Sequence, residues 1–161
     1  MSKGTKKGSF MKKIVTLSTV LLGLSLVMFS PLSMAEQSDD IIIENPWVGA
    51  PPPGALALGA FAVLKNPTDQ AIVLQQAKAT GFDSVQLHES INKNNMHRMV
   101  EIQELRIPAK SQVALKHGSY HIMLMGVHHE PKPGDHIPIT LVFSDHSHKT
   151  VEFKVSKGMH H

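Results

Sequence analysis

The chain has 161 residues, no cysteine and a formal net charge of +3. Without cysteine it can form neither disulfides nor thiolate sites, which excludes zinc fingers, Cys-x-x-Cys redox centres and Cys-ligated blue-copper sites. This length predicts a single domain that is stabilised by a packed core.

Residues 1–35 have the features of a secretory signal peptide. Lysines precede an apolar run over residues 14–29, and Ser33-Met34-Ala35 has the small-x-small pattern of a cleavage site. We expect cleavage after Ala35, export to the periplasm and no membrane span in the mature chain; retention of the run as an anchor is the less favoured alternative. Met1 and Met11 are both compatible with this signal.

Removal of the signal reverses the net charge. Residues 1–35 contain five lysines and no acidic residue, so the remainder has 11 basic and 13 acidic residues, a net charge of about −2 with histidine neutral. This charge gives no electrostatic footprint for nucleic acid. All 11 histidines lie in the mature part, a bias that indicates metal or proton chemistry.

The mature chain has the pattern of an all-β protein. Residues 36–40 are polar and acidic, and we expect them to be a flexible lead-in to an ordered domain over 41–155. Short apolar runs separated by Pro, Gly, Asn and Asp are typical of a β-sandwich or barrel. The predicted strands cover residues 41–48, 57–65, 71–79, 84–91, 98–107, 112–115, 121–127, 137–143 and 150–155. Residues 156–161 are expected to form a flexible tail that contains His and Met.

Proline marks several of the connections between these strands. The Pro-Pro-Pro-Gly segment at 51–54 predicts a rigid surface loop, because proline cannot donate to a strand ladder. Asn66-Pro67-Thr68-Asp69 predicts a hairpin turn between the second and third strands. No amphipathic helix, internal repeat or heptad pattern is evident, so we expect one compact antiparallel domain.

The most informative residues are two imidazoles and two thioethers at defined spacing. Ten residues separate His88 from Met99, and twenty-one separate Met99 from His121, which is followed two residues later by Met123. Thioethers have little attraction for hard cations, whereas imidazole suits several transition metals. A mixed set of this kind therefore indicates copper, particularly Cu(I).

Strand alternation places His121 and Met123 on one face and Ile122 and Leu124 on the other. This arrangement predicts a two-ligand arm, with Met125 further along the same face as a spare ligand, a shield or a core residue. The competing interpretation is that the methionines fill gaps in the core and that the histidine is structural. The different character of the two faces favours a site.

The other two candidates carry weaker individual signals. His88 alone is equally compatible with a surface residue of a strand. Met99 follows the polar segment 92–95, near a strand entry, where an exposed methionine is unexpected on burial grounds. His97 shares a face with Met99 and is a reserve ligand, whereas Met96 lies on the opposite face.

A second group of potential ligands occupies the C-terminal part of the chain. Its members are His128, His129, His136, His146, His148, Met159, His160 and His161. Imidazoles could hold Cu(II) or zinc as a secondary site there, so an alternative function is a His-rich periplasmic copper or zinc buffer, or a copper-resistance protein. Solvated loop and tail histidines are the simpler interpretation. A β-sandwich interaction module with incidental ligands is a third possibility.

The sequence lacks the common motifs of catalysis. It contains no glycine-rich phosphate loop, no Gly-x-Ser-x-Gly elbow and no carboxylate pair in an apolar context. We therefore expect a binding protein and not an enzyme.

The spacing resembles that of the periplasmic PCuAC copper chaperones, whose motif is a His, a Met after ten residues and a His-x-Met after twenty-one more. The residues His88, Met99, His121 and Met123 match this motif without adjustment, and the flanking segments 45–48, 52–54, 64–67 and 107–109 also fit. The resemblance covers residues 41–155. Many members carry another Met two residues after the first His, where this chain has Ser90, so we expect four ligands and not five.

This resemblance implies a cupredoxin-like Greek-key β-sandwich that holds one Cu(I) at its exposed edge through these four residues. It further implies a monomeric carrier that passes copper to an acceptor, especially the CuA centre in subunit II of cytochrome c oxidase, beside Sco-type proteins. Neutral thioethers and imidazoles suit an exported compartment, where thiolates oxidise.

Overall fold

A computed structural model describes Gly4, residues 35–93 and residues 96–157 of the chain. The chain divides into two units, Met1–Ser33 and Met34–His161, and the fold below is that of the second. Most of the predicted signal peptide and residues 158–161 of the predicted tail lie outside the described residues. Within the described part, no helix is long and apolar enough to cross a membrane.

The described residues of the second unit form ten strands and one short helix. The elements are α1 (Gln37–Asp40), β1 (Ile42–Gly49), β2 (Ala57–Asn66), β3 (Ile72–Lys78), β4 (Phe82–Lys93), β5 (Met96–Glu101), β6 (Leu105–Ile107), β7 (Ser111–Leu115), β8 (Tyr120–Val127), β9 (His136–Phe143) and β10 (His148–Ser156). The predicted all-β class is confirmed, and most strand boundaries lie within two residues of those predicted.

All ten strands form one hydrogen-bonded sheet that folds over a single core. The strand order is β5-β4-β8-β7-β2-β1-β10-β9-β3-β6. β5 and β6 are consecutive in the chain but lie at opposite ends of this order, so the sheet must curve back on itself. The core accordingly joins residues from both halves, such as Ile122 and Leu124 of β8 with Leu74 of β3 and Phe143 of β9.

Alternation along β2 and β8 decides which face becomes core. Ile122 and Leu124 are fully buried, as expected for apolar residues two apart in a strand. In β2, Leu58 and Ala60 point the same way and are also buried. The intervening residues of both strands therefore point to the outer face of the sheet, where the candidate site lies.

The strand predicted over residues 98–107 is wrong as a single element. It is divided between β5, which pairs with β4, and β6, which pairs with β3. Between the two strands, the Ile102 amide donates to the Leu87 carbonyl at 2.9 Å, and the chain then crosses from one half of the sheet to the other. The apolar pattern continues through the crossing, so it did not reveal the break.

The predicted hairpin turn at residues 66–69 is also wrong. β2 and β3 are not neighbours in the sheet, because residues 66–69 carry the chain from one half of the sheet to the other. Asn66 is buried with 1% of its surface exposed, and its side-chain amide donates to the carbonyls of Gln70, Ile107 and Pro108 at 2.7–3.1 Å. The Asn66 side chain thus links the segment between β2 and β3 to the turn after β6.

Residues 36–40, expected to be a flexible lead-in, contain α1, which packs on the loop between β9 and β10. The Gln37 amide donates to Asp145 Oδ2 at 2.7 Å, and the amide of the buried Ser38 donates to Ser147 Oγ at 3.0 Å. Burial acts to raise the pKa of Asp145, but hydrogen bonds from Gln37 and Ser147 outweigh it and lower that pKa. The ordered structure thus begins before Ile41.

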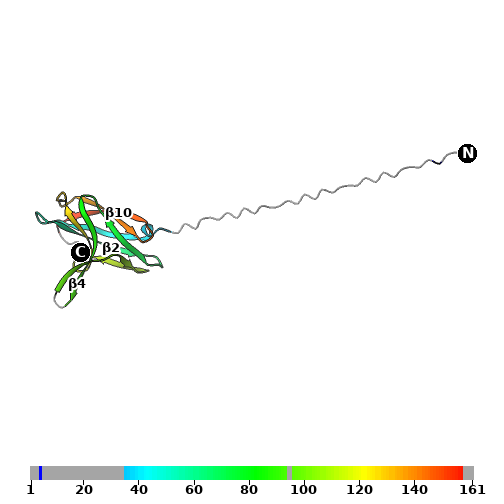
Figure 1. Cartoon of the computed structure of the whole chain (residues 1–161), viewed down its shortest axis with the longest axis horizontal. Coiled ribbons are helices and arrows are strands. Elements are labelled where there is room, and N and C mark those ends of the chain that lie inside the picture. The colour runs from blue at the N-terminus through cyan, green and yellow to red at the C-terminus, as the bar shows by residue number, and fades with distance from the viewer. Residues whose placement is uncertain (1–3, 5–34, 94–95, 158–161) are drawn as a thin grey trace. The chain divides into compact units, whose positions relative to one another are not determined.

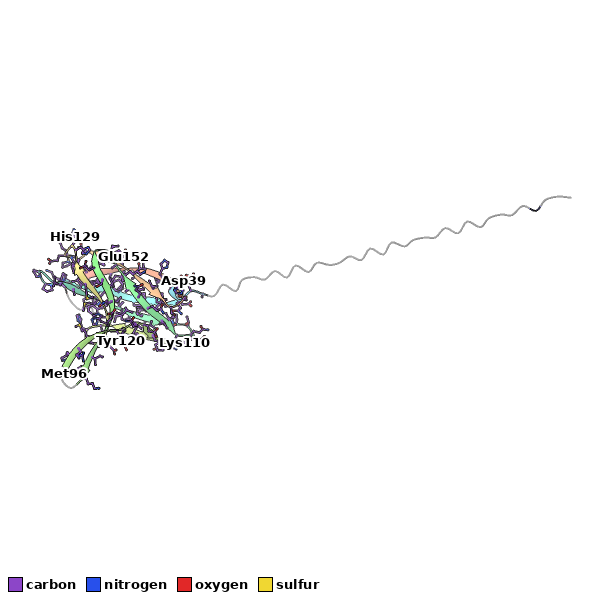
Figure 2. The ribbon with its side chains drawn as sticks, viewed as in Figure 1. Asp39, Met96, Lys110, Tyr120, His129 and Glu152 are labelled. Carbon is purple, nitrogen blue, oxygen red and sulfur yellow. The ribbon has the colours of Figure 1, made fainter. Side chains whose placement is uncertain are left out.

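The hairpin of β4 and β5 extends beyond the body of the domain, as Figure 1 shows for the end of β4. β5 is an edge strand, and every one of its residues is exposed. Met96 lies at the end of this hairpin (Figure 2). The half of the hairpin nearest the body contributes to the candidate site.

Candidate metal centre

The site is built on the outer face of three neighbouring strands, β5, β4 and β8, with β2 on the far side of β8. His121 of β8 lies directly opposite His88 of β4 in the strand register. Met123, two residues further along β8, lies opposite Gln86 of β4 and opposite Gly59 of β2. The register between β4 and β8 therefore brings the two predicted histidines together.

Met99 enters the same face from β5. It lies opposite Ser90 of β4, and Ser90 follows His88 by two residues on the same face. Met99 is 64% exposed, whereas His121 is 4% exposed. The four predicted residues thus share one face, with the imidazoles inside and the Met99 thioether at the rim.

A cavity of about 310 Å³ opens on this face. Three of the predicted ligands line it, namely Met99, His121 and Met123. Its remaining walls come from the end of β1, the β1–β2 loop, β2, β4 and the turn before β8: Gly49, Ala50, Pro51, Pro52, Ala57, Leu58, Gly59, Phe61, Ser90, His117 and Gly118. His88 does not line the cavity but contacts His121, with their ring centroids 5.6 Å apart and their planes at 67°.

Two ring nitrogens at this site lack partners. Among the described residues, the buried side-chain nitrogen and oxygen atoms without a hydrogen bond are His88 Nδ1 and His121 Nε2. A buried polar atom without a partner costs roughly 1–3 kcal/mol, so such atoms are rare in folded proteins. Both belong to predicted ligands, and a bound metal ion would satisfy both.

The opposite nitrogen of each ring is hydrogen-bonded to an acceptor. His88 Nε2 donates to Gln86 Oε1 at 2.9 Å, and His121 Nδ1 donates to the Ser119 carbonyl at 3.1 Å. Because each acceptor holds a proton on the nitrogen that faces it, the remaining nitrogen of the neutral ring carries a free lone pair. The two histidines thus present different nitrogens as ligands, Nδ1 from His88 and Nε2 from His121.

The electrostatic surroundings keep His121 neutral. Burial lowers the pKa of His121 below its ordinary value of 6.5, and the nearby His88 and His117 lower it further, against an opposing hydrogen bond to Ser119. A neutral imidazole is the form that binds metals. The lowered pKa of His121 therefore reduces the competition of protons with a metal ion for this residue.

The rings of Phe61 and His117 line one side of the cavity. Trp47 of β1 lies opposite Phe61 of β2, with ring centroids 4.7 Å apart, and His117 stacks on Phe61 at 4.3 Å. A bulge in β1 between Glu44 and Trp47 sets this orientation, since a bulge redirects the side chains that follow it. The left-handed backbone of Asn45, with φ of 49°, lies within it.

The reserve ligands lie outside the cavity. Met125 is on the same face of β8 but opposite Ala57 and Ser84, one step beyond Met123. His97 shares the face of Met99, and it pairs with Asn92 near the hairpin tip. Met96 lines a separate groove on the opposite face of the hairpin, with Ile91, Lys93, Arg98 and Val100.

The histidines of the second predicted group do not converge. In residues 35–93 and 96–157, no three His, Cys, Asp or Glu side chains are close enough to hold a metal ion. His128 instead pairs with Asp83 Oδ1 at 2.7 Å. Met159, His160 and His161 lie outside the described residues.

Three residues at the site were missed by the sequence interpretation: Gln86, Phe61 and His117. The position of Gln86 two residues before His88 could have indicated that it shares the face of that histidine, by the same alternation used for His121. Phe61 and His117 carried no comparable signal, because they reach the site through the sheet register and the turn before β8.

Sequence comparisons agree with this architecture. A family model described as "Putative lipoprotein LpqE-like" matches residues 41–155. A putative lipoprotein, Lxx21020 from Leifsonia xyli subsp. xyli, is 34% identical over 148 residues, which cover 89% of this chain and 88% of that protein. An uncharacterised protein from Rickettsia prowazekii, RP573, is 28% identical over 97 residues, 60% of this chain and 54% of its own length.

Solved structures with the same fold include a copper-bound PCuAC domain from PmoF2, which is 25% identical, covers 74% of this chain and 94% of that domain, and has a TM-score of 0.63. The solution structure of CuI-DR1885 from Deinococcus radiodurans is 30% identical, covers 71% of this chain and 77% of that protein, and has a TM-score of 0.60. The predicted cupredoxin-like fold is confirmed. The chain therefore belongs to the LpqE-like family, the family of PCuAC domains.

Proposed function

We propose that this protein is an exported Cu(I)-binding metallochaperone that holds one ion through His88, Met99, His121 and Met123. The observation that carries the proposal is the pair of buried ring nitrogens without partners, on the sheet face that also bears both thioethers. Two imidazoles and two thioethers favour a soft late transition metal, and Cu(I) is the common ion of that class.

The asymmetry of the site suits a carrier. His121 is buried and fixed by its hydrogen bond to Ser119, whereas Met99 is largely exposed on an edge strand. An acceptor could thus replace Met99 first while the imidazoles still hold the ion. Neutral ligands also release Cu(I) readily to a thiolate, which is the stronger donor for this ion.

Relatives with known ligands support this assignment. One PCuAC domain of PmoF2 was solved with copper bound, and DR1885 was solved with Cu(I). Both are at least 25% identical to this chain, and the donor atoms of this chain independently favour copper.

The cellular part of the proposal is more specific. We propose that a signal peptide is cleaved after Ala35, that the mature protein is a periplasmic monomer, and that it is a carrier and not an enzyme. Its acceptor is the CuA centre in subunit II of cytochrome c oxidase, with a Sco-type protein acting beside it.

Binding is tested by anaerobic titration of Cu(I) against a chromogenic chelator. The Met99→Leu, Met123→Leu double variant should lose at least about 100-fold in affinity, because even partners that only orient ligands are worth about 10–100-fold. Leucine conserves volume, so the fold should persist. Met96→Leu and Met125→Leu are matched controls outside the cavity and should change the affinity little. Unchanged affinity in the double variant would refute the site.

Transfer is tested by mixing the Cu(I)-loaded protein with the apo CuA domain of an oxidase subunit II. Appearance of the CuA absorption, at a rate that depends on Met99, supports the chaperone proposal. Retention of the copper by the loaded protein would contradict this acceptor.

A His-rich buffer has less support, because the described histidines of residues 128–148 form no three-ligand group. Truncation before Ser156 tests the contribution of the tail. If most copper binding is lost with the tail, the buffer function is the correct one.

A further inference from the structure

His117 lies at the mouth of the cavity on the turn between β7 and β8. Two hydrogen bonds hold this turn, from the Lys116 amide to the Tyr120 carbonyl at 2.8 Å and from the Ser119 amide to the Lys116 carbonyl at 3.1 Å. The side chain of His117 is exposed, yet it lines the same cavity as His121, Met123 and Met99. A third imidazole is thus available to an ion in this cavity.

The imidazole of His117 packs against the ring of Phe61. It stacks on Phe61 at 4.3 Å, and the same Phe61 ring lies 6.4 Å from the ring of His121. Gly118, the next residue, has φ of 74°, and a Cβ built there would meet no atom within 4 Å. The turn is therefore uncrowded at Gly118, and His117 itself is exposed on the cavity lining and outside the buried core.

As they stand, no three His or acidic side chains of the described residues are close enough to share one ion. His117 must therefore move before it can bind together with His88 and His121.

The additional donor changes the preference of the site. Two thioethers and two imidazoles suit Cu(I), whereas imidazole nitrogen in a tetragonal arrangement suits Cu(II). We propose that His117 is a third imidazole ligand that turns from Phe61 into the cavity and, with His88 and His121, allows the site to take Cu(II) as well as Cu(I). This inference rests on the proposed copper site and adds a residue outside its four-ligand set.

The test compares Cu(II) and Cu(I) binding in the His117→Phe variant, which keeps an aromatic ring to stack on Phe61. Trp47 is the only tryptophan of the chain, and its ring lies 6.0 Å from that of His117, so quenching of its fluorescence reports Cu(II) in this cavity. His97→Phe is the matched control, because His97 is an exposed histidine on the same face but outside the cavity.

We expect His117→Phe to weaken Cu(II) binding at least about tenfold, the effect of about 1.4 kcal/mol, and to reduce the number of nitrogens coupled to Cu(II) in electron paramagnetic resonance. Cu(I) affinity should change less than about threefold, and His97→Phe should change neither. Unchanged Cu(II) binding, or equal weakening of both ions, would overturn the inference. Failure of the four-ligand proposal is seen separately, as unchanged Cu(I) affinity in the Met99→Leu, Met123→Leu variant.

Discussion

His88 and His121 face each other across β4 and β8, and each directs one unpartnered ring nitrogen into buried space. Their second nitrogens are held by acceptors on their own strand or its preceding turn, Gln86 and Ser119. The protein thus holds two imidazoles in contact, and a defined nitrogen of each is left without a partner. Two buried nitrogens without partners cost stability, and the proposed role of both histidines as metal ligands would account for them.

Gln86 should fix the nitrogen by which His88 binds. Gln86→Leu removes the acceptor, so the His88 ring can exchange its protonated nitrogen, and Cu(I) affinity should fall by about 10–100-fold. Gln86→Glu keeps an acceptor at this position and should retain most of the affinity. Imidazole ¹⁵N chemical shifts of the Cu(I) form provide the direct measurement.

In the native protein, those shifts should show His88 bound through Nδ1 and His121 through Nε2. If Gln86→Leu leaves both the shifts and the affinity unchanged, Gln86 has no positioning role.

The stability of the metal-free protein should decrease below about pH 6.5 because of His121. Its folded-state pKa lies below the ordinary value of 6.5, so between these two values the unfolded chain binds more protons than the folded one. The free energy of unfolding then falls as the pH drops through this window. Urea titrations at pH 7.5 and pH 5.5 should show the difference.

His121→Gln is the appropriate comparison, since glutamine does not titrate. The free energy of unfolding of this variant should be less sensitive to pH over the same range. An equal loss of stability on acidification in both proteins would show that His121 is not responsible.

Asn66 should be among the most destabilising positions to truncate. Its side chain donates to the carbonyls of Gln70, Ile107 and Pro108 and accepts from the amide and the hydroxyl of Thr68. Asn66→Ala leaves several buried polar groups without partners, at roughly 1–3 kcal/mol for each unsatisfied group. We expect the midpoint of urea unfolding to fall by an amount equivalent to about 2–4 kcal/mol.

Asn92→Ala is the control for this prediction, because Asn92 is exposed on the β4–β5 hairpin. Its unfolding midpoint should stay close to that of the native protein. A change of less than about 0.5 kcal/mol for Asn66→Ala, the range typical of surface positions, would show that these hydrogen bonds contribute little.

Local patterns predicted the elements and the faces of this protein well. In β8, apolar Ile122 and Leu124 alternate with His121 and Met123, and this alternation correctly predicted the core face and the outer face of the strand. Strand alternation can be predicted in this way because it depends only on neighbouring residues. The order β5-β4-β8 brings Met99 and His88 to the side of His121 from the next two strands of the sheet.

Features that depend on long-range contacts could not be predicted in the same way. The crossing between β5 and β6 and the role of Asn66 depend on the way in which the sheet curves back on itself. A short stretch of sequence does not contain this information. The same is true of His117, whose place beside the cavity depends on the pairing of β2 with β1 and β8. The assignment of the four ligands stays a prediction, which the positions of His88 and His121 support.

Copper K-edge X-ray absorption spectroscopy on the Cu(I)-loaded protein tests the central claim most directly. The four-ligand site predicts both a nitrogen shell and a sulfur shell around one ion, and loss of the sulfur shell in the Met99→Leu, Met123→Leu variant. Because the chain has no cysteine, any protein-derived sulfur shell must come from methionine. A spectrum with nitrogen or oxygen neighbours and no sulfur would contradict the account.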